Sequence, residues 1–225
     1  MNLRHELKFT LHKDAATLLK QRMRLIMDYD RNADENGEYM IRSLYFDTLD
    51  STAYFEKLDG VQTRKKFRIR YYNQNIDFVR LECKEKFDTM TRKRIAKIDI
   101  PTAKRFIEGN VEISDIEGEE VVKDFLVEMK TRHLIPSVIV DYRRTAFVMD
   151  SLDVRVTFDE QIHSRGYDHD FFQATYAGIP MMEDFESVVE IKYNDILPDT
   201  IVGVLNSTPM IRQALSKFTL CRSVL

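Results

Sequence analysis

Hydrophobic residues recur along the chain with two different spacings, and each spacing predicts a different kind of element. Spacings of three and four predict helices over Lys13–Met27, Pro101–Glu108, Glu117–His133 and Thr200–Asn206. Alternating or β-branched segments predict strands over Tyr39–Thr48, Arg64–Asn73, Asp77–Lys86, Arg92–Ile100, Ser137–Val148, Val154–Asp159 and Val188–Tyr193. The pattern therefore predicts a single α+β domain over residues 1–225, with a large antiparallel sheet or barrel and helices packed on it.

Cationic side chains occupy one face of several predicted strands. Because residues two apart in a strand share a face, Lys66, Arg68 and Arg70 lie together, opposite the apolar residues between them. The same parity groups polar residues of the other strands, including an opening strand: Arg4, Glu6 and Lys8; Arg80, Glu82, Lys84 and Lys86; Lys93 and Lys97; Tyr142 and Arg144; Arg155, Thr157 and Asp159; Glu190 and Lys192. Like charges directly opposite one another destabilise a sheet. Two interpretations therefore stay open: a solvated basic face, or a site for a compensating anion.

Four carboxylates interrupt these cationic faces, and they are Glu6, Glu82, Asp159 and Glu190. Taken singly, each is expected to pair with a neighbouring lysine or arginine. Taken together with the cations, they suit Mg²⁺ or Mn²⁺, hard ions that bridge carboxylates and phosphate oxygens. Phosphoryl transfer needs positioning and charge neutralisation more than a protein nucleophile. The combination therefore favours phosphoryl-transfer chemistry.

Composition restricts the partners. The chain has 34 lysines and arginines against 37 acids, a formal net charge of −3. A basic field over the whole protein is therefore absent, and we expect local anion binding and no nucleic-acid partner. Cys83 and Cys221 show no CxxC spacing, which predicts unpaired thiols in a reducing, cytoplasmic compartment. No apolar run is long enough to span a bilayer, and Met1–Phe9 lacks a signal core.

Familiar motifs of other nucleotide and hydrolase sites are missing. The sequence contains no GxxxxGK[ST], GxGxxG, GxSxG or HExxH. The five histidines show no metal-ligand spacing, and we interpret them as structural or exposed. Aromatic residues alternate with cations over Phe67–Tyr72, which suggests base stacking. Their opposite strand parity favours a role in the core.

Seven short segments occur in an order that resembles a known family. They are Glu6–Phe9, Ile41–Thr48, Lys66–Arg70, Leu81–Lys84, Tyr142–Phe147, Glu190–Lys192 and Ser216–Phe218. The set spans nearly the whole chain and is similar to the VTC domain, the polyphosphate polymerase branch of the triphosphate tunnel metalloenzyme superfamily. This resemblance implies a tunnel of eight antiparallel strands lined by basic side chains, with helices packed outside.

The resemblance also implies roles for particular residues. The side chains that grip phosphate oxygens in catalysis would be Lys8, Arg68, Arg70, Lys84, Lys93, Arg144, Arg155 and Lys217. Further substrate contacts would come from Tyr142 and Ser216, from Lys192 by strand parity, and from Arg42 by position. Glu190 would hold Mn²⁺ or Mg²⁺, with Glu6 and Glu82 as weaker candidates.

Two positions depart from the family pattern. The superfamily often opens with ExExK, but Arg4 stands at the first acidic position, which weakens a two-metal triphosphatase mechanism. The polymerase pattern KxSK has Ala214 in place of its first lysine, and Arg212 lies nearby as a substitute if that segment is extended.

We therefore expect a metal-dependent polyphosphate polymerase that uses ATP, orthophosphate and polyphosphate. There are two alternatives. One is an inorganic triphosphatase that uses the same cationic side chains, and the other is a non-catalytic polyphosphate-binding module. The sequence leaves open a membrane-protein partner, the oligomeric state, and the fold of residues 163–184.

Overall fold

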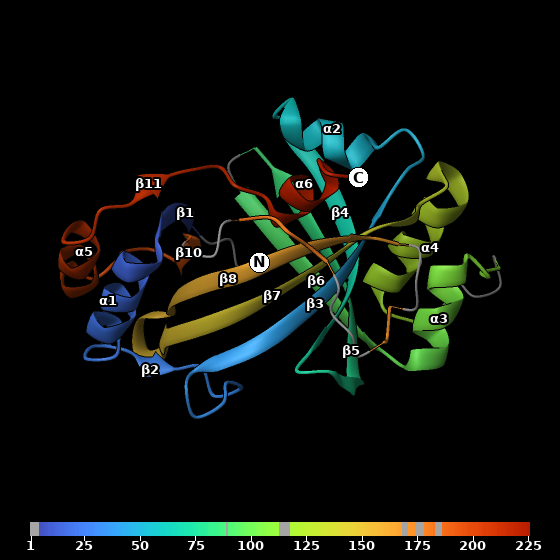
Figure 1. The fold of residues 1–225 in the computed structure, drawn as a ribbon. Coiled ribbons are helices and arrows are strands. Elements are labelled where there is room, and N and C mark those ends of the chain that lie inside the picture. Colours follow the sequence, from blue (N-terminus) through green and yellow to red (C-terminus); the bar gives the residue numbers. More distant parts are fainter. Residues whose placement is uncertain (1–4, 89, 113–117, 168–170, 174–177, 183–185) are drawn as a thin grey trace. The chain divides into compact units, whose positions relative to one another are not determined.

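The computed structural model describes residues 5–88, 90–112, 118–167, 171–173, 178–182 and 186–225, and the chain divides into two compact units (Figure 1). Unit 1 comprises residues 1–40, 142–163 and 180–216, and unit 2 comprises residues 41–141, 164–179 and 217–225. Among the helices of the described residues, none combines the length and apolar character needed to traverse a bilayer.

The strands pair into one sheet, and they differ widely in length. Eight of them have eight or more residues: β1 (His5–His12), β3 (Glu38–Asp47), β4 (Thr63–Tyr72), β5 (Asn75–Phe87), β6 (Met90–Ile98), β7 (Ile135–Met149), β8 (Val154–Gly166) and β10 (Glu186–Tyr193). Three have two residues: β2 (Asp28–Tyr29), β9 (Ile179–Pro180) and β11 (Ile211–Arg212). The hydrogen-bonded order is β11-β1-β10-β8-β7-β3-β4-β5-β6, with β2 on β7 and β9 on β8.

This order corrects the predicted architecture. The antiparallel sheet is confirmed, but the described sheet has 11 strands and two ends, β11 and β6, so it is not the closed eight-stranded barrel that we expected. The two-residue strands were not predicted because a period of two needs more residues to become visible.

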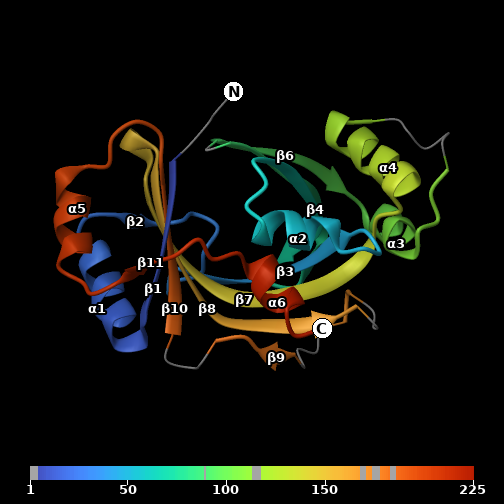
Figure 2. The ribbon, with the colours of Figure 1, turned by 90° about the horizontal axis from the view of Figure 1, so that it is seen from above.

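Unit 1 packs two helices beside its strands. Helices α1 (Lys13–Met23) and α5 (Asp199–Asn206) lie side by side (Figures 1 and 2). Their apolar faces enter a core that also holds Phe147, Phe158 and Ile191. Both helices were predicted, although α1 ends at Met23 because the next residues form a turn.

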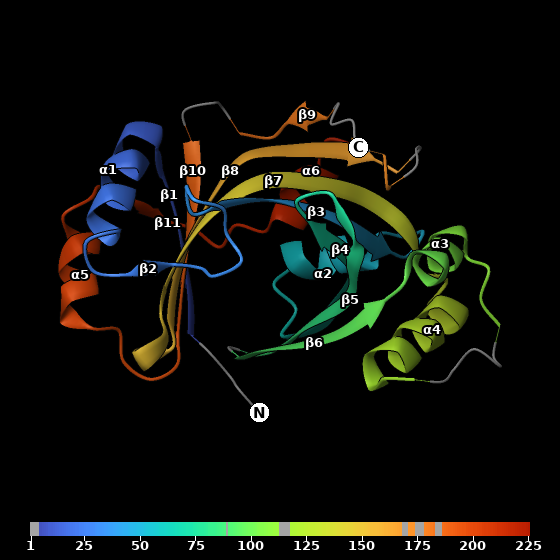
Figure 3. The same ribbon diagram turned by 90° about the horizontal axis from the view of Figure 1, so that it is seen from below.

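Unit 2 contains the hairpins β3–β4, β4–β5 and β5–β6. Its helices are α2 (Thr52–Leu58), α3 (Ile100–Glu108), α4 (Glu120–Arg132) and α6 (Lys217–Arg222). Figure 3 shows α3 and α4 next to each other beside β5 and β6. Phe125 of α4 packs against the rings of Phe46, Phe67 and Phe106. The buried odd-numbered residues of β4 and β5 therefore face α3 and α4, and the even-numbered residues face the other way.

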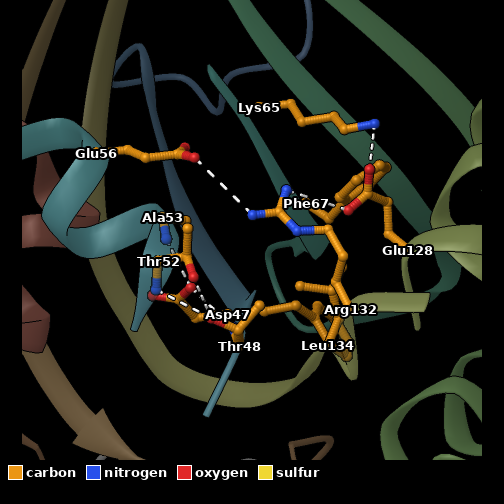
Figure 4. Close-up of a pocket in the computed structure, with 11 residues that line it drawn as sticks. Asp47, Thr48, Thr52, Ala53, Glu56, Lys65, Phe67, Glu128, Arg132 and Leu134 are labelled. Carbon is orange, nitrogen blue, oxygen red and sulfur yellow. Dashed lines mark hydrogen bonds and ion pairs between the residues drawn. The ribbon is translucent and has the colours of Figure 1, made fainter. Parts of the chain in front are cut away.

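Helix α2 was not predicted, and its start explains why. Ser51 precedes it with a positive φ of 54° and makes no capping hydrogen bond with its side chain. The cap comes instead from Asp47 at the end of β3. Its carboxylate accepts a hydrogen bond from the backbone N–H of Ala53 at 2.8 Å (Figure 4) and another from that of Tyr54 at 3.2 Å. A cap six residues away lies outside the usual helix-start pattern.

Candidate active site

Unit 2 presents its cations in three cross-strand rows. The first row pairs Lys66 with Lys84 and Lys84 with Lys93. The second places Arg68, Glu82 and Ile95 side by side, and the third places Arg70, Arg80 and Lys97 side by side. Successive rows lie about 7 Å apart along the strands. The parity predicted for β4, β5 and β6 is confirmed, and we call this surface of unit 2 the cationic face.

Glu82 connects three cations of the cationic face. Its fully buried carboxylate accepts from Arg68 Nε at 2.7 Å and Nη2 at 2.5 Å, and from Lys93 Nζ at 2.6 Å. Arg70 Nη1 lies 3.9 Å away. Burial alone would raise the pKa of Glu82, but Arg68, Arg70 and Lys93 outweigh it and hold the pKa well below its usual range. One carboxylate therefore contacts three basic side chains. Because burial lowers the pKa of Lys93 to about 7, the positive excess of this group comes mainly from the two arginines.

Two residues of β3 hold the arginines from the neighbouring strand. Arg70 Nε donates to Ser43 Oγ at 2.8 Å, and Arg68 Nη1 donates to the hydroxyl of Tyr45 at 2.8 Å. Burial would raise the pKa of Tyr45, but Arg68 and Arg70 lower it below its ordinary value. Neither residue was assigned a role from the sequence. Their alternate spacing in β3 opposite two arginines was the signal that could have found them.

Arg42 lies on the other face of β3. Its Nε and Nη2 donate to the two carboxylate oxygens of Asp141 at 2.8 and 3.0 Å, and Nη1 donates to the carbonyl of Phe171 at 3.3 Å. The side chain is 1% exposed. These contacts hold Arg42 on the face opposite the cationic face, since one step along a strand reverses the face. Its part in substrate binding stays a prediction.

Lys66 was not among the predicted site residues, although it lies in the first row. Its ammonium sits over the ring of Phe218 in α6, 4.3 Å from the centroid. Burial and then the nearby cations Arg64 and Lys57 lower the pKa of Lys66 to about 7. Lys217, a predicted phosphate contact, is the first residue of α6, and Ser216 directly precedes it.

Unit 1 carries a second cluster, built on β1, β10 and β8. The register places Lys8, Glu190 and Thr157 in one row, and Glu6, Lys192 and Arg155 in the next. Lys8 Nζ lies 2.9 Å from Glu6 Oε1 and 3.7 Å from Glu190 Oε2, and it donates to the carbonyl of Leu215 at 3.2 Å. Lys192 Nζ lies 2.5 Å from Glu190 Oε1.

Arginines of β7 and β8 complete the cluster in unit 1. Arg144 donates from Nε and Nη2 to the two oxygens of buried Asp159 at 2.6 and 2.8 Å, and it lies over the ring of Tyr142. Burial opposes the charge of Arg144, but Asp159 outweighs it and raises the pKa well above its usual value. Arg155 donates to the hydroxyl of Tyr39 at 2.7 Å and pairs with Asp30.

The donor atoms of unit 1 suit a hard divalent ion. Glu6 and Glu190 both approach Lys8, so their oxygens already converge on one positive charge. Thr157 lies directly opposite Glu190 on the neighbouring strand, and its Oγ1 is buried and has no hydrogen-bond partner within the described residues. Mg²⁺ is commonly held by one or two carboxylates, with phosphate oxygens and waters as the other ligands. A cluster of three or more acidic, histidine or cysteine ligands is absent from the described part of the chain.

The predicted residues thus gather into two groups rather than scattering. The group in unit 2 contains Arg68, Arg70, Lys84, Lys93, Glu82 and Lys217, and the group in unit 1 contains Lys8, Glu6, Tyr142, Arg144, Arg155, Glu190, Lys192 and Ser216. That the two groups line a single tunnel stays a prediction. Arg212 lies in β11 opposite Phe9 and is exposed, whereas Arg4 lies outside the described residues.

A small cavity in unit 2 is separate from these groups. It has a volume of about 20 Å³ and lies between α2, α4 and β4, where Arg132 approaches Glu56 and Glu128, and Lys65 pairs with Glu128 (Figure 4). Such a volume holds about one water molecule. Lys65 has the parity of the helix-covered face, so this cavity does not belong to the cationic face.

Comparisons with known proteins identify a family and a shared fold. The model of the VTC domain family matches residues 3–225. An adenylyl cyclase candidate from Hippeastrum with a dominant triphosphatase activity has a TM-score of 0.58 at 14% identity, over 100% of this chain and 96% of its own. An adenylate cyclase candidate from Vibrio parahaemolyticus has a TM-score of 0.53 at 11% sequence identity, over 97% of each chain. An adenylate cyclase candidate from Bacillus halodurans has a TM-score of 0.51 at 15% sequence identity, over 92% of this chain and 89% of its own. These identities establish a shared fold alone, and no curated protein sequence is significantly similar to the chain.

Proposed function

The chain belongs to the VTC domain family, and from this premise we propose that it is a metal-dependent polyphosphate polymerase. In this proposal the γ-phosphoryl group of ATP passes to orthophosphate or to the end of a growing polyphosphate chain. The observation that carries it is the group around Glu82, in which one buried carboxylate fixes three cations and leaves an excess of positive charge. Fixed donors with excess charge are what a chain of phosphates requires.

The residues act by positioning and charge. Arg68, Arg70 and Lys93 bind the phosphate oxygens, and their contacts with Glu82 reduce the rearrangement needed when substrate arrives. The bond from the γ-phosphorus to the β–γ bridging oxygen breaks, that oxygen leaves on ADP with the electron pair, and an acceptor phosphate oxygen forms the new bond. Glu190, Glu6 and Thr157 would hold Mg²⁺ or Mn²⁺, which supplies positive charge to the phosphate oxygens when bound.

A triphosphatase is the second candidate because the Hippeastrum structure of similar fold has a dominant triphosphatase activity. The same cations would hold the triphosphate, and water would replace phosphate as the acceptor. Arg4 at the first position of the acidic motif counts against this candidate, since it removes one carboxylate that a two-metal mechanism would use.

Product analysis separates the candidates. The purified protein is incubated with ATP and Mn²⁺, and the phosphate products are resolved on a gel, with Arg68→Ala as the inactive control. A ladder of lengthening polyphosphate that is absent in the variant supports the polymerase. Release of orthophosphate without a ladder indicates a triphosphatase in place of a polymerase. Tight polyphosphate binding with neither product indicates a binding module.

A further inference from the structure

The third row of the cationic face continues into a pair of aromatic rings. Arg80 places its guanidinium 4.4 Å from the centroid of Phe78 and 5.5 Å from that of Tyr72, and Lys97 Nζ lies 5.2 Å from the centroid of Phe78. Phe78 and Arg80 share the even parity of the cationic face. The register of β4 is irregular between Arg70 and Tyr72, and the contact with Arg80 brings the ring of Tyr72 to this end of the face. Phe78 is 38% exposed.

These rings are unsuited to phosphate. The face of an aromatic ring carries negative charge from its quadrupole, so it attracts cations and repels anions. A surface that only bound phosphate would gain from more cations here and would lose by an exposed phenylalanine. A flat ligand, by contrast, can stack on the ring of Phe78 or on the planar guanidinium of Arg80.

The cations at this end differ from those at the centre. Arg68, Arg70 and Lys93 contact Glu82. Arg80 and Lys97 make no ion pair with any carboxylate within the described ranges, and their recorded contacts are with aromatic rings. Their positive charges are therefore available to a ligand. The flat part of such a ligand would stack on the rings, and its anionic part would lie next to Arg80 and Lys97.

We propose that Phe78, Tyr72 and Arg80 form a stacking site for the nucleobase of the nucleoside triphosphate substrate. This inference rests on the proposed function and adds the orientation in which the substrate binds. From Tyr72 to Lys66 the strand β4 covers six residues, or about 20 Å, comparable with an extended nucleoside triphosphate. The base lies at the Phe78 end, and the terminal phosphate points toward the row of Lys66, Lys84 and Lys93.

Binding of ATP and of tripolyphosphate, measured by titration calorimetry, tests the site because only ATP carries a base. Phe78→Ala is compared with Phe87→Ala, a phenylalanine of the same strand that is 41% exposed and has the opposite parity. We expect Phe78→Ala to weaken ATP binding at least about fivefold, and to change tripolyphosphate binding less than twofold. Phe87→Ala leaves both affinities unchanged.

Other outcomes overturn the stacking site in distinguishable ways. Equal weakening of both ligands by Phe78→Ala would make the residue a support of the phosphate site or of the fold. If Phe78→Ala weakens the binding of neither ligand, the contact between these cations and rings has no role in ligand binding. Binding of neither ligand by the wild type would overturn the proposed function together with this site. Phe78→Leu, which keeps the apolar bulk, repeats the comparison should the alanine variant fail to fold.

Discussion

Glu82 controls the charge balance of the cationic face, and its contacts favour pairing over metal binding. Three cations already surround its carboxylate, so a divalent ion would have to displace them. The sequence placed Glu82 on this face but left its partners open, since strand parity gives the face and not which of several neighbours a side chain reaches.

Glu82→Gln should destabilise the free protein and make its stability depend on an added anion. Removing one partner from a buried charge cluster costs about 3–5 kcal/mol, and tripolyphosphate should restore part of this loss by compensating the same cations. Thermal unfolding with and without tripolyphosphate measures both effects. Glu85→Gln is the control, because Glu85 pairs with Arg92 and Arg94 on the opposite face. An equal rescue of both variants would contradict this role.

Glu190 is the residue on which metal binding should depend most. Its carboxylate contacts Lys192 and approaches Lys8, and Thr157 lies directly opposite it on β8. Glu190→Gln should shift the Mn²⁺ concentration needed for half-maximal activity upward by about tenfold or abolish activity, since a carboxylate oxygen is lost. Glu186→Gln, on the same strand but exposed, should titrate like the wild type. Identical metal titrations of all three proteins would remove Glu190 from the site.

Lys66 should destabilise the protein at neutral pH. The pKa of Lys66 is lowered to about 7 by burial, so folding at pH 7–10 requires the ammonium to give up its proton or stay charged in an unfavourable place. The penalty is absent above its unfolded value of 10.5, grows as the pH falls, and is complete below about 7.

Lys66→Met should therefore raise the melting temperature near pH 7. Because Lys66 is only partly buried and lies on an aromatic ring, we expect a gain on the order of 1 kcal/mol, or about 2–4 °C. Melting curves from pH 6 to 10 should show this gain shrinking as the pH rises. Lys86→Met, a half-buried lysine of the neighbouring strand, is the comparison. A gain that is constant with pH would show that packing and not charge is responsible.

At the scale of elements, the long strands and four helices were readable from the sequence, and the remaining elements were not. Periodicity suffices for β4 and β5, where every second residue is buried from Phe67 to Tyr71 and from Val79 to Glu85. It fails for α2, whose cap arrives from Asp47. It also fails for the end of β8, where Gln161 has a φ of 51° and interrupts the alternation.

Asp47→Ala should loosen α2 because the helix loses its cap. Loss of a helix cap costs about 0.5–2 kcal/mol, which corresponds to a fall in melting temperature of about 1–8 °C. Calorimetric unfolding gives the value, and Asp59→Ala, at the other end of α2, should change it little. Equal melting temperatures for Asp47→Ala and the wild type would show that the cap seen in Figure 4 does not support the helix.

At the scale of the whole molecule, the sequence predicted the family and the strand faces on which the candidate site residues lie, and it missed the open order of the sheet. A period of two assigns faces within a strand, but the closure of a sheet depends on pairings far apart in the chain. The closed tunnel therefore came from the resemblance alone. The strand faces of the candidate site residues were more readable, because each group is built from strands whose parity is visible in the sequence, as in Arg68 and Arg70.

The most direct test of this account is the affinity of the protein for phosphates of increasing chain length. Pyrophosphate, tripolyphosphate and longer polyphosphates are titrated by calorimetry at two salt concentrations. The cationic rows repeat about every 7 Å, so affinity should rise with each added phosphate until the rows are spanned, and salt should weaken it. Arg68→Ala should flatten this dependence. Binding that is equally weak at every length would contradict the account.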